Sequence, residues 1–352
     1  MNKPFEQTSF IVKLTNWEFW PFFVVYFFVI IYHCWLSIKA RSFFFFSASN
    51  PGIEMGGMLG ESKSSILDKI PEEFRAKYVL VRAGTSYHEA ISIFTKSTLS
   101  FPVIAKPDVG ERGQGVQKID TVENLVAYHL STKATYIIQE FIDFPVELGI
   151  FYYRFPNAER GTISSIVMKD FLKVVGNGTS SLLELIEQYP RARFVRNHLS
   201  KVFENVLTTI PKEGQVIELE QIGNHCRGTT FLDANDLING KLINVFDQLS
   251  NKIDGFYYGR YDLRCNSIED LYEGKNIKIL ELNGCGAEPA HIYQPGFSFW
   301  AGQKVLLAHH HIMYKISMEN HEKGIPFPNL VNIREKYKLY KKAIDSISTH
   351  HG

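Results

Sequence analysis

The chain has 352 residues, of which 45% are apolar and 21% are charged. These proportions are typical of globular proteins and exclude a disordered, collagen-like or small disulfide-stapled chain. Lys and Arg number 38 against 37 Asp and Glu, so the net charge of +1 gives no indication of nucleic-acid binding, and we expect none. The four cysteines show no C-x-x-C spacing, and we expect reduced thiols in a reducing compartment.

An apolar segment lies near the N-terminus. Residues 19–38 read FWPFFVVYFFVIIYHCWLSI and contain no charged side chain. As a helix they would span about 30 Å, close to the thickness of a bilayer core. We therefore predict a transmembrane or membrane-anchoring segment at residues 17–42, after a tail at residues 1–16. Pro21 and His33 leave open a re-entrant or interfacial segment, and a buried core helix is a further alternative.

The charged residues around this segment indicate its orientation. Lys39 and Arg41 follow it directly, although Lys3 and Lys13 lie on its other side. Positive charge is enriched in the cytoplasmic loops of membrane proteins. We therefore expect the protein to be located at a membrane, with the rest of the chain facing the cytoplasm.

The following residues alternate between strand-like and helix-like patterns. The run FFFFSAS predicts a short strand at residues 43–49, and Ser62 is a candidate cap for a helix to about Ile70. Further strands are predicted at 78–81, 101–106, 116–119, 136–141, 146–155, 161–175, 215–222, 228–234, 256–264 and 277–283. Helices are predicted between the first two of these, from Thr121, and at 179–188, 191–208, 235–251 and 298–319. Long antiparallel runs mixed with helices indicate an α+β fold rather than a doubly wound sheet.

A lysine and a glycine-rich loop follow an apolar strand in FPVIAKPDVGERGQGV, residues 101–116. The strand ends at Lys106, and the loop contains Gly110, Glu111, Gly113 and Gly115. Glycines let backbone N–H groups approach phosphate oxygens closely, and the lysine adds a positive charge. The loop is neither a Walker A loop, because G-K-[ST] is missing, nor a dinucleotide-binding fingerprint. A plain hairpin is the alternative.

Two acids flank the junction of the next two strands. In IIQEFIDFPVELGIF, Glu140 ends one strand and Glu147 begins the next. A nucleotide base needs backbone groups for its edge, and a ribose needs a carboxylate for its hydroxyls. Two solvated acids at a turn are the alternative.

A third group of polar residues lies on two later strands. Gly259-Arg260-Tyr261-Asp262 is followed by KILELN, which contains Glu281 and Asn283. In a strand, residues i and i+2 share a face, so these two side chains point together. Oxygen ligands beside a second acid suit Mg²⁺ that bridges phosphates. Polar residues on a half-exposed sheet are the alternative.

In this order, the three features resemble the ATP-grasp superfamily, and within it D-alanine–D-alanine ligase and related carboxylate–amine ligases. The resemblance covers about residues 101–295. It implies an ATP-grasp fold, in which two α+β subdomains hold ATP between them. It also implies ATP and Mg²⁺ or Mn²⁺ as cofactors. Lys106 would contact the ATP phosphates, the loop 110–115 would close over them, and Arg260 would face the reacting acyl phosphate.

The same resemblance assigns the remaining nucleotide and metal contacts. Backbone groups of Phe141, Ile142 and Asp143 beside Glu140 would hold adenine, and Glu147 would hold the ribose. Asp262, Glu281 and Asn283 would bind the metal. Residues 174–187 are similar to a segment of cyanophycin and glutathione synthetases, in which a nearby lysine reaches the phosphates. Lys169 or Lys173 would take that role. Lys63 in GESKSS matches a further lysine of the ligases.

The sequence departs from these ligases at both ends. A stub at residues 43–100 stands in place of their complete N-terminal α/β domain, and GCGAEPAHIYQPG follows the E-x-N motif in place of their acceptor turn. The acceptor site is therefore expected to differ. Arg227 is a candidate clamp for a substrate carboxylate, His225 is a candidate base, and His291 is a candidate substrate contact. His309, His310 and His311 favour a core or surface role over metal binding.

The C-terminal residues predict a basic amphipathic helix at 327–352. Its apolar positions are spaced by three and four residues. We expect it to pack on the domain; contact with an anionic membrane is the alternative. The ATP-grasp domain is then expected at residues 101–326.

The first functional hypothesis is a membrane-anchored, ATP-dependent carboxylate–amine or carboxylate–thiol ligase. ATP would phosphorylate a carboxylate, and the nucleophile would displace phosphate from the acyl phosphate, with Lys106 and Arg260 neutralising charge. The carboxylate and amine would be small molecules or lipid-linked, since soluble amino-acid ligases have no evident need of an anchor. A small-molecule kinase of the same fold and a non-catalytic nucleotide-binding membrane module are the alternatives.

Overall fold

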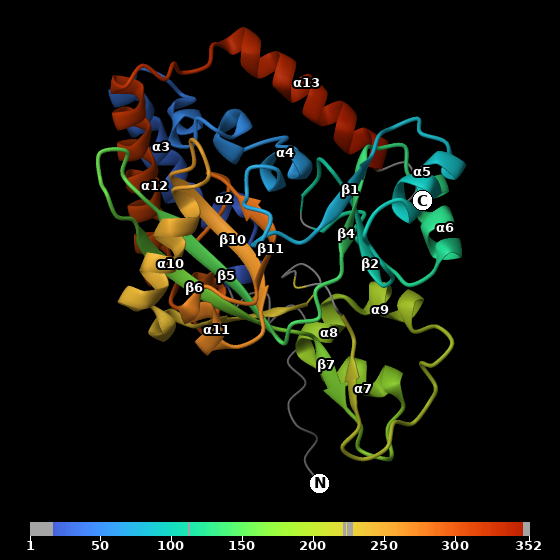
Figure 1. The fold of residues 1–352 in the computed structure, drawn as a ribbon. Coiled ribbons are helices and arrows are strands. Elements are labelled where there is room, and N and C mark those ends of the chain that lie inside the picture. Colours follow the sequence, from blue (N-terminus) through green and yellow to red (C-terminus); the bar gives the residue numbers. More distant parts are fainter. Residues whose placement is uncertain (1–16, 112, 221–222, 224–227, 348–352) are drawn as a thin grey trace.

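The computed structural model describes residues 17–111, 113–220, 223 and 228–347. These residues form a five-stranded sheet, a four-stranded sheet, a two-stranded sheet and the helices that cover them (Figure 1). The pairings between the strands are antiparallel. The predicted α+β class is therefore confirmed.

The five-stranded sheet is the centre of the molecule, with the strand order β11-β10-β5-β6-β9. Its strands are β5 (Val146–Tyr153), β6 (Thr162–Asp170), β9 (Thr230–Asp233), β10 (Tyr258–Cys265) and β11 (Ile277–Asn283). Ile150 and Tyr152 of β5 and Leu263 of β10 are buried on one face. The helices α10 (Gly240–Ser250) and α11 (Ile268–Glu273) cover this face. α10 starts five residues later than predicted because Asn239 caps it by accepting from Leu242 N.

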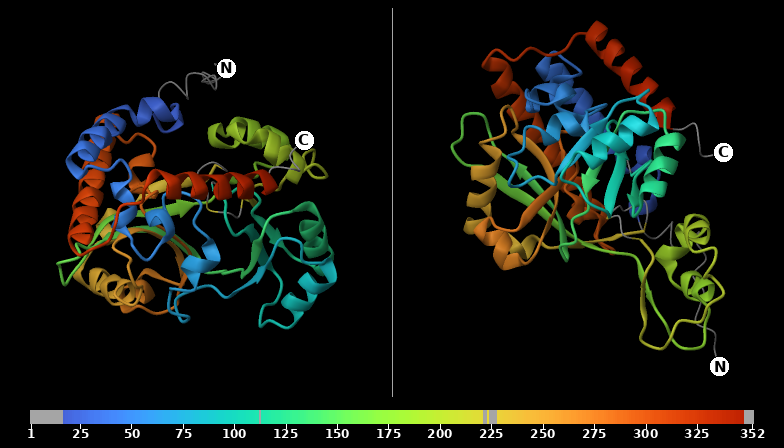
Figure 2. Two further views of the ribbon diagram at one scale, coloured as in Figure 1. Left: turned by 90° about the horizontal axis from the view of Figure 1, so that it is seen from above. Right: turned by 45° about the vertical axis from the view of Figure 1, so that its right-hand side comes forward.

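The opposite face of the large sheet carries the N-terminal region and a long C-terminal helix. Phe151 and Tyr258 of the sheet are buried with Leu36, Phe45 and Ile316. These come from α3 (Phe27–Ala40), the 3₁₀ helix η2 (Phe45–Ser49) and α12 (Phe299–Glu322), which lie side by side in Figures 1 and 2. The helix predicted at 298–319 is thus present. It packs against the beginning of the chain.

The strand predicted at residues 43–49 is wrong, because η2 occupies this region. Phe45 and Phe46 are consecutive and are both buried. A strand with one buried face would turn consecutive side chains to opposite sides. The helical turn lets both rings enter the same core.

The four-stranded sheet has the order β1-β4-β2-β3. Its strands are β1 (Tyr78–Val81), β2 (Val103–Pro107), β3 (Gln117–Ile119) and β4 (Tyr136–Glu140), and the helices α5 (Tyr87–Thr95) and α6 (Val122–Ser131) pack on it through Phe94 and Leu125. The boundary predicted at residue 100 does not divide the structure, since β1 and α5 share this sheet and core. The short helix α4 (Lys63–Leu67) begins after Ser62, which accepts from Ser65 N as predicted.

A third unit extends away from both sheets, as the right-hand view of Figure 2 shows. It consists of β7 (Lys173–Val175), β8 (Val216–Glu218), α7 (Leu182–Gln188), α8 (Pro190–Phe194) and α9 (Arg196–Val202). Its core contains Leu172, Leu185 and Leu199. The helix predicted at 191–208 is thus two short helices that meet at Val195. Arg191 donates to both carboxylate oxygens of Glu18 at 2.9 Å, which ties this unit to the N-terminal segment.

The N-terminal apolar segment does not form one continuous helix. It is divided into η1 (Trp17–Phe19), α2 (Phe22–Val25) and α3, and the chain leaves helical geometry at Tyr26. In the part of the chain that the structure describes, no helix combines the length and apolarity needed to cross a membrane. The predicted transmembrane helix is therefore not found. Val29, Leu36 and Ala40 of α3 are buried, so one side of it belongs to the core.

The predicted C-terminal helix is present as α13 (Leu330–Ile347). Figures 1 and 2 show that it crosses from the end of α12 toward the four-stranded sheet. The Tyr340 hydroxyl donates to Glu111 at 2.8 Å, and Lys336 forms an ion pair with Glu54. The helix therefore packs on the domain, as expected.

Histidines join α3 to α12. His33 Nδ1 lies 2.8 Å from His310 Nε2, and His33 Nε2 lies 3.0 Å from the Phe43 carbonyl oxygen. Burial lowers the pKa of His310 to about 4 and also lowers the pKa of His33. The contact is therefore made by neutral rings.

This pairing predicts a loss of stability in acid. Between about pH 6.5 and about pH 4, His33 and His310 become protonated in the unfolded chain but stay neutral in the folded protein. Protonation therefore favours the unfolded state, and the free energy of unfolding falls as the pH drops through this range. His310→Gln should reduce this loss by up to about 3 kcal/mol. Urea unfolding at several pH values measures it. The exposed His88 supplies the control His88→Gln, which should keep the wild-type slope. An unchanged slope in His310→Gln would contradict the prediction.

Candidate active site

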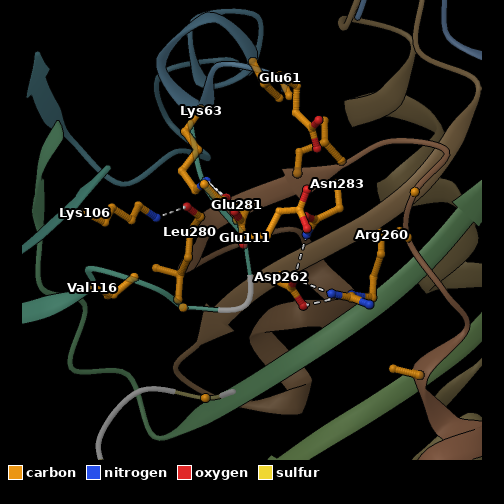
Figure 3. Close-up of a pocket in the computed structure, with 18 of the residues that line it drawn as sticks. Glu61, Lys63, Lys106, Glu111, Val116, Arg260, Asp262, Leu280, Glu281 and Asn283 are labelled. Atoms are coloured by element: carbon orange, nitrogen blue, oxygen red, sulfur yellow. Dashed lines mark hydrogen bonds and ion pairs between the residues drawn. The ribbon is translucent and has the colours of Figure 1, made fainter. Parts of the chain in front are cut away.

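A cleft of about 660 Å³ lies between the two larger sheets. Its walls come from β2 and β4 on one side, β10 and β11 on the other, and from α2, α4 and residues 110–111, 113–114 and 116. Figure 3 shows Lys63, Lys106, Arg260, Asp262, Glu281 and Asn283 directed toward the same space. The three sequence motifs therefore meet in one cavity.

Strand register explains why the charged side chains gather there. Asp262 of β10 is paired with Glu281 of β11 and with Gly149 of β5, and Arg264 is paired with Glu147. Directly paired residues of antiparallel strands point to the same face. Gly149 leaves the room that this packing needs, since a Cβ there would come within 3.1 Å of Asp262 Oδ1.

Asp262 is the most strongly held carboxylate of the cleft. Arg260 donates to its two oxygens at 3.1 and 3.0 Å, Asn283 Nδ2 donates at 2.8 Å, and Lys169 Nζ lies at 3.4 Å. Burial alone would raise the pKa of Asp262, but Arg260 and Lys169 hold it at about 2. Asp262 is therefore ionised at neutral pH.

Lys169 connects Asp262 to a second buried carboxylate. Its Nζ lies 3.0 Å from Glu147 Oε1, and Arg264 Nε donates to Glu147 Oε2 at 2.7 Å. Both oxygens of Glu147 are thus bound by cations, and it does not present a free carboxylate to a ribose. Between the two lysines that the sequence left open, Lys169 lines the cleft, whereas Lys173 is exposed and pairs with Asp170.

Two more lysines reach the cleft from the opposite wall. Lys106 Nζ donates to the Leu280 carbonyl oxygen at 3.2 Å, and burial lowers the pKa of its amine to about 8. Lys63 Nζ donates to the Gly110 carbonyl oxygen at 2.6 Å and lies 3.6 Å from Glu281. The sequence-based placement of both lysines at this site is consistent with the geometry.

The glycine-rich loop forms an edge of the cleft. Gly110, Glu111 and Gly113 line it, and Gly115 follows directly. Gly115 has a φ of +69°, and a Cβ there would come within 2.8 Å of Pro107, so a side chain would distort the turn.

The predicted adenine hinge lies at one end of the cleft. Glu140, Phe141 and Ile142 line it, whereas Asp143 is not among the lining residues. The Ile142 carbonyl oxygen already accepts from Arg264 Nη1 at 2.7 Å. Glu140 Oε2 accepts from Lys77 N at 3.2 Å.

One predicted substrate residue, His291, is not among the residues that line the cleft. His291 is buried elsewhere, with Nδ1 2.7 Å from Ser165 Oγ, because it lies on the 3₁₀ helix η6 (Ala290–Tyr293) under β6. In this position His291 contacts β6, and a substrate contact by His291 stays a prediction. Arg227 and His225 lie outside the described residues.

The structure adds two acids that the motifs did not indicate. Glu61 lies near Lys63 and Glu281, and burial raises its pKa (Figure 3). Glu288 accepts from the Tyr293 hydroxyl at 2.5 Å, and burial raises its pKa to about 7. Glu288 can therefore exchange a proton near neutral pH. Its only sequence signal was its place in the segment that departs from the ligases.

Part of the wall of the cleft is aromatic. Phe22 of α2 and Tyr26, which follows α2, line the cleft, and their rings stack with centroids 4.4 Å apart. A segment predicted to lie in a membrane thus supplies part of the cavity.

The donor set fits a hard divalent cation. Among the described residues no three His, Cys, Asp or Glu side chains are grouped as a metal site. Mg²⁺, however, commonly uses one or two carboxylates together with substrate phosphates and water. Asp262 and Glu281 are ionisable cross-strand partners, and Asn283 adds an amide oxygen. Glu281 and the amide oxygen of Asn283 are therefore the groups that would hold the ion. Asp262 would join them only by giving up contacts to Arg260 and Lys169, since both of its oxygens are already bound.

Comparisons with known proteins gave matches among solved structures alone. No family model and no curated protein sequence matches the chain. A bifunctional glutathione synthetase from Pasteurella multocida is 14% identical, with 70% of this chain and 36% of that chain covered and a TM-score of 0.36. This chain thus spans about a third of that enzyme's length. Because the TM-score is below 0.5, this similarity does not assign an activity.

Two ligases are similar over more of their length. D-alanine–D-alanine ligase from Bacillus anthracis is 10% identical, with 79% of this chain and 69% of that chain covered and a TM-score of 0.39. VanG D-Ala:D-Ser ligase from Enterococcus faecalis is 13% identical, with 72% and 61% covered and a TM-score of 0.40. Both are ligases of the kind that the sequence motifs resemble.

The buried network predicts a large loss of stability from a change at Lys169 and almost none from a change at Lys173. Lys169→Met keeps the volume but leaves Glu147 and Asp262 without a shared cation, so the free energy of unfolding should fall by about 3–5 kcal/mol. The matched control Lys173→Met removes an exposed ion pair and should change it by less than about 0.5 kcal/mol. Urea unfolding at pH 7 measures both. Equal effects would contradict the assignment.

Proposed function

We propose that the protein is an ATP-grasp ligase that joins a carboxylate to an amine, or to a thiol, with release of ADP and phosphate. The observation that supports this best is the meeting of Lys106, the glycine-rich loop, and the Asp262–Glu281–Asn283 group in one cleft between two α+β units. The resemblance supplied these residues as separate motifs. That these residues lie in one cleft is an observation from the structure and does not depend on the resemblance.

The cleft provides charge where phosphoryl transfer requires it. Lys63, Lys106 and Lys169 would neutralise phosphate oxygens, and Arg260 would face the developing acyl phosphate. Arg260 is already oriented by its two hydrogen bonds to Asp262. A magnesium ion held by Asp262, Glu281 and Asn283 would supply electrostatic stabilisation of the transferring phosphoryl group.

The acceptor end favours a substrate with an apolar part. Phe22 and Tyr26 line the cleft together with Glu288. We propose that the nucleophile or the carboxylate is lipid-linked and that the catalytic domain works at the cytoplasmic face of a membrane. Glu288 is positioned to take a proton from an attacking ammonium group.

The metal assignment predicts a separation of turnover from nucleotide binding. Glu281→Gln removes one charge from a hard-cation site but keeps its shape. Turnover should fall by about two orders of magnitude or more, with ATP binding much less affected. ADP release and calorimetric titration with ATP in magnesium measure the two effects. Exposed Glu269 supplies the control Glu269→Gln. Near-normal ADP release from Glu281→Gln would refute the assignment.

The reaction class predicts the fate of one oxygen atom. ADP release is first screened with pooled amino acids, peptides and lipid extracts, and we expect the largest stimulation from lipid extracts. If a carboxylate is activated as an acyl phosphate, its oxygen leaves with phosphate. ¹⁸O from a labelled carboxylate should therefore appear in inorganic phosphate by mass spectrometry. Unlabelled phosphate during confirmed product formation would indicate a kinase or another route.

A further inference from the structure

The outer side of α2 and α3 is a continuous apolar face. We call it the aromatic face; it consists of Phe22, Phe23, Phe27, Phe28, Ile30, Ile31, Trp35, Ile38 and Phe43, together with Trp300 of α12. Phe23 and Ile38 are 76% and 77% exposed, and Trp300 is 63% exposed. Large exposed apolar areas on soluble folds mark binding surfaces.

The face belongs to a well-packed part of the fold. Val29 and Leu36 on the inner side of α3 are buried, and Gln303 of α12 donates to the Val25 carbonyl oxygen at 2.9 Å. The rings of Phe28 and Trp300 are 5.7 Å apart, which joins the two helices on the outer side. Figure 2 shows α2, α3 and α12 together along one edge of the molecule. The exposed rings are thus held in place by a folded core.

The charged residues within the segments that carry the aromatic face are basic, and the acids that directly flank the first segment, Glu18 and Glu54, are paired with Arg191 and Lys336. From Phe19 to Ile53 the charged residues are Lys39 and Arg41, and from Phe299 to Met318 they are Lys304 and Lys315. All four are exposed. The Lys39 ammonium lies 4.5 Å from the centre of the Trp35 ring, so the cation borders the apolar area directly. An anionic surface is the complement of this pattern.

We propose that the aromatic face inserts into the interface of an anionic lipid bilayer, with α3 parallel to the membrane plane. Tryptophan and other aromatic rings favour the headgroup level, and such helices bury their apolar side by about 5–10 Å. Lys39, Arg41, Lys304 and Lys315 would meet lipid phosphates. A second copy of the chain fits less well, because a two-fold contact would bring the same cations together.

This orientation places the candidate active site beside the lipid. Phe22 belongs both to the aromatic face and to the cleft wall, so the cleft ends where the bilayer would begin. The binding proposal does not depend on ligase activity. Vesicle binding tests the membrane proposal and ADP release tests the proposed function, so a negative result in one does not decide the other.

The test is flotation of the full chain with phosphatidylcholine vesicles, with and without phosphatidylglycerol. Wild-type protein should float with anionic vesicles and be released by salt. Phe23→Ser/Ile38→Ser should weaken binding at least about tenfold. The matched control Leu130→Ser/Val216→Ser changes exposed apolar residues on α6 and β8 and should bind normally. Lys304→Glu/Lys315→Glu should lose the preference for anionic vesicles.

Two further measurements show whether a loss of binding comes from the aromatic face or from unfolding of a variant. Trp300→Ser changes the face from α12 and should also weaken binding, and urea unfolding should show that each variant keeps wild-type stability. Wild-type binding by both Phe23→Ser/Ile38→Ser and Trp300→Ser would overturn the proposal. So would a protein that does not bind vesicles but dimerises in sedimentation velocity, with the dimer lost in these variants.

Discussion

The arrangement of the cleft depends on one buried charge, the Asp262 carboxylate. Burying an ion is costly unless it is paired and fully hydrogen-bonded, and Arg260, Asn283 and Lys169 meet that requirement from β10, β11 and β6. A one-residue shift of register between these strands would turn Asn283 or Lys169 to the face opposite Asp262. The same requirement extends through Lys169 to Glu147 and Arg264, which then fixes the Ile142 carbonyl. The electrostatics therefore select the strand alignment that assembles the site.

This coupling also shows which parts of the site could be read from the sequence. Glu281 and Asn283 share a face because strand side chains alternate, and that required only the local pattern. Alternation along β6 also puts Lys169 on the same face as Val167. Val167 is paired with Gly149 of β5, so this face is the one that carries Asp262. Glu61 and Glu288 had no such local signal. Their role in the cleft comes from contacts with residues distant in the chain.

The N-terminal segment shows the opposite case, in which a strong local pattern predicted a membrane-spanning helix that is not found among the described residues. Twenty uncharged residues satisfy the composition of a membrane-spanning helix and equally that of a helix packed on one side. The difference lies in α12, more than 250 residues later, whose Gln303 and His310 pair with Val25 and His33. No window of local sequence contains that information. Similarly, the aromatic run at 43–49 is apolar enough for a strand, but its core partners on α12 make it a turn of helix.

The distance in sequence between α3 and α12 has a consequence for synthesis of the chain. His33 and His310 are 277 residues apart, so the partner of the apolar segment is made much later than the segment itself. At ordinary elongation rates the ribosome needs roughly 14–55 s to add those residues. During that interval Leu36, Phe45 and Phe46 lack the α12 side of their core, which includes Met313 and Ile316, and remain partly uncovered. The order of translation therefore leaves an aromatic, apolar stretch partly uncovered until α12 is made, and the folding yield should depend on what covers that stretch in the meantime.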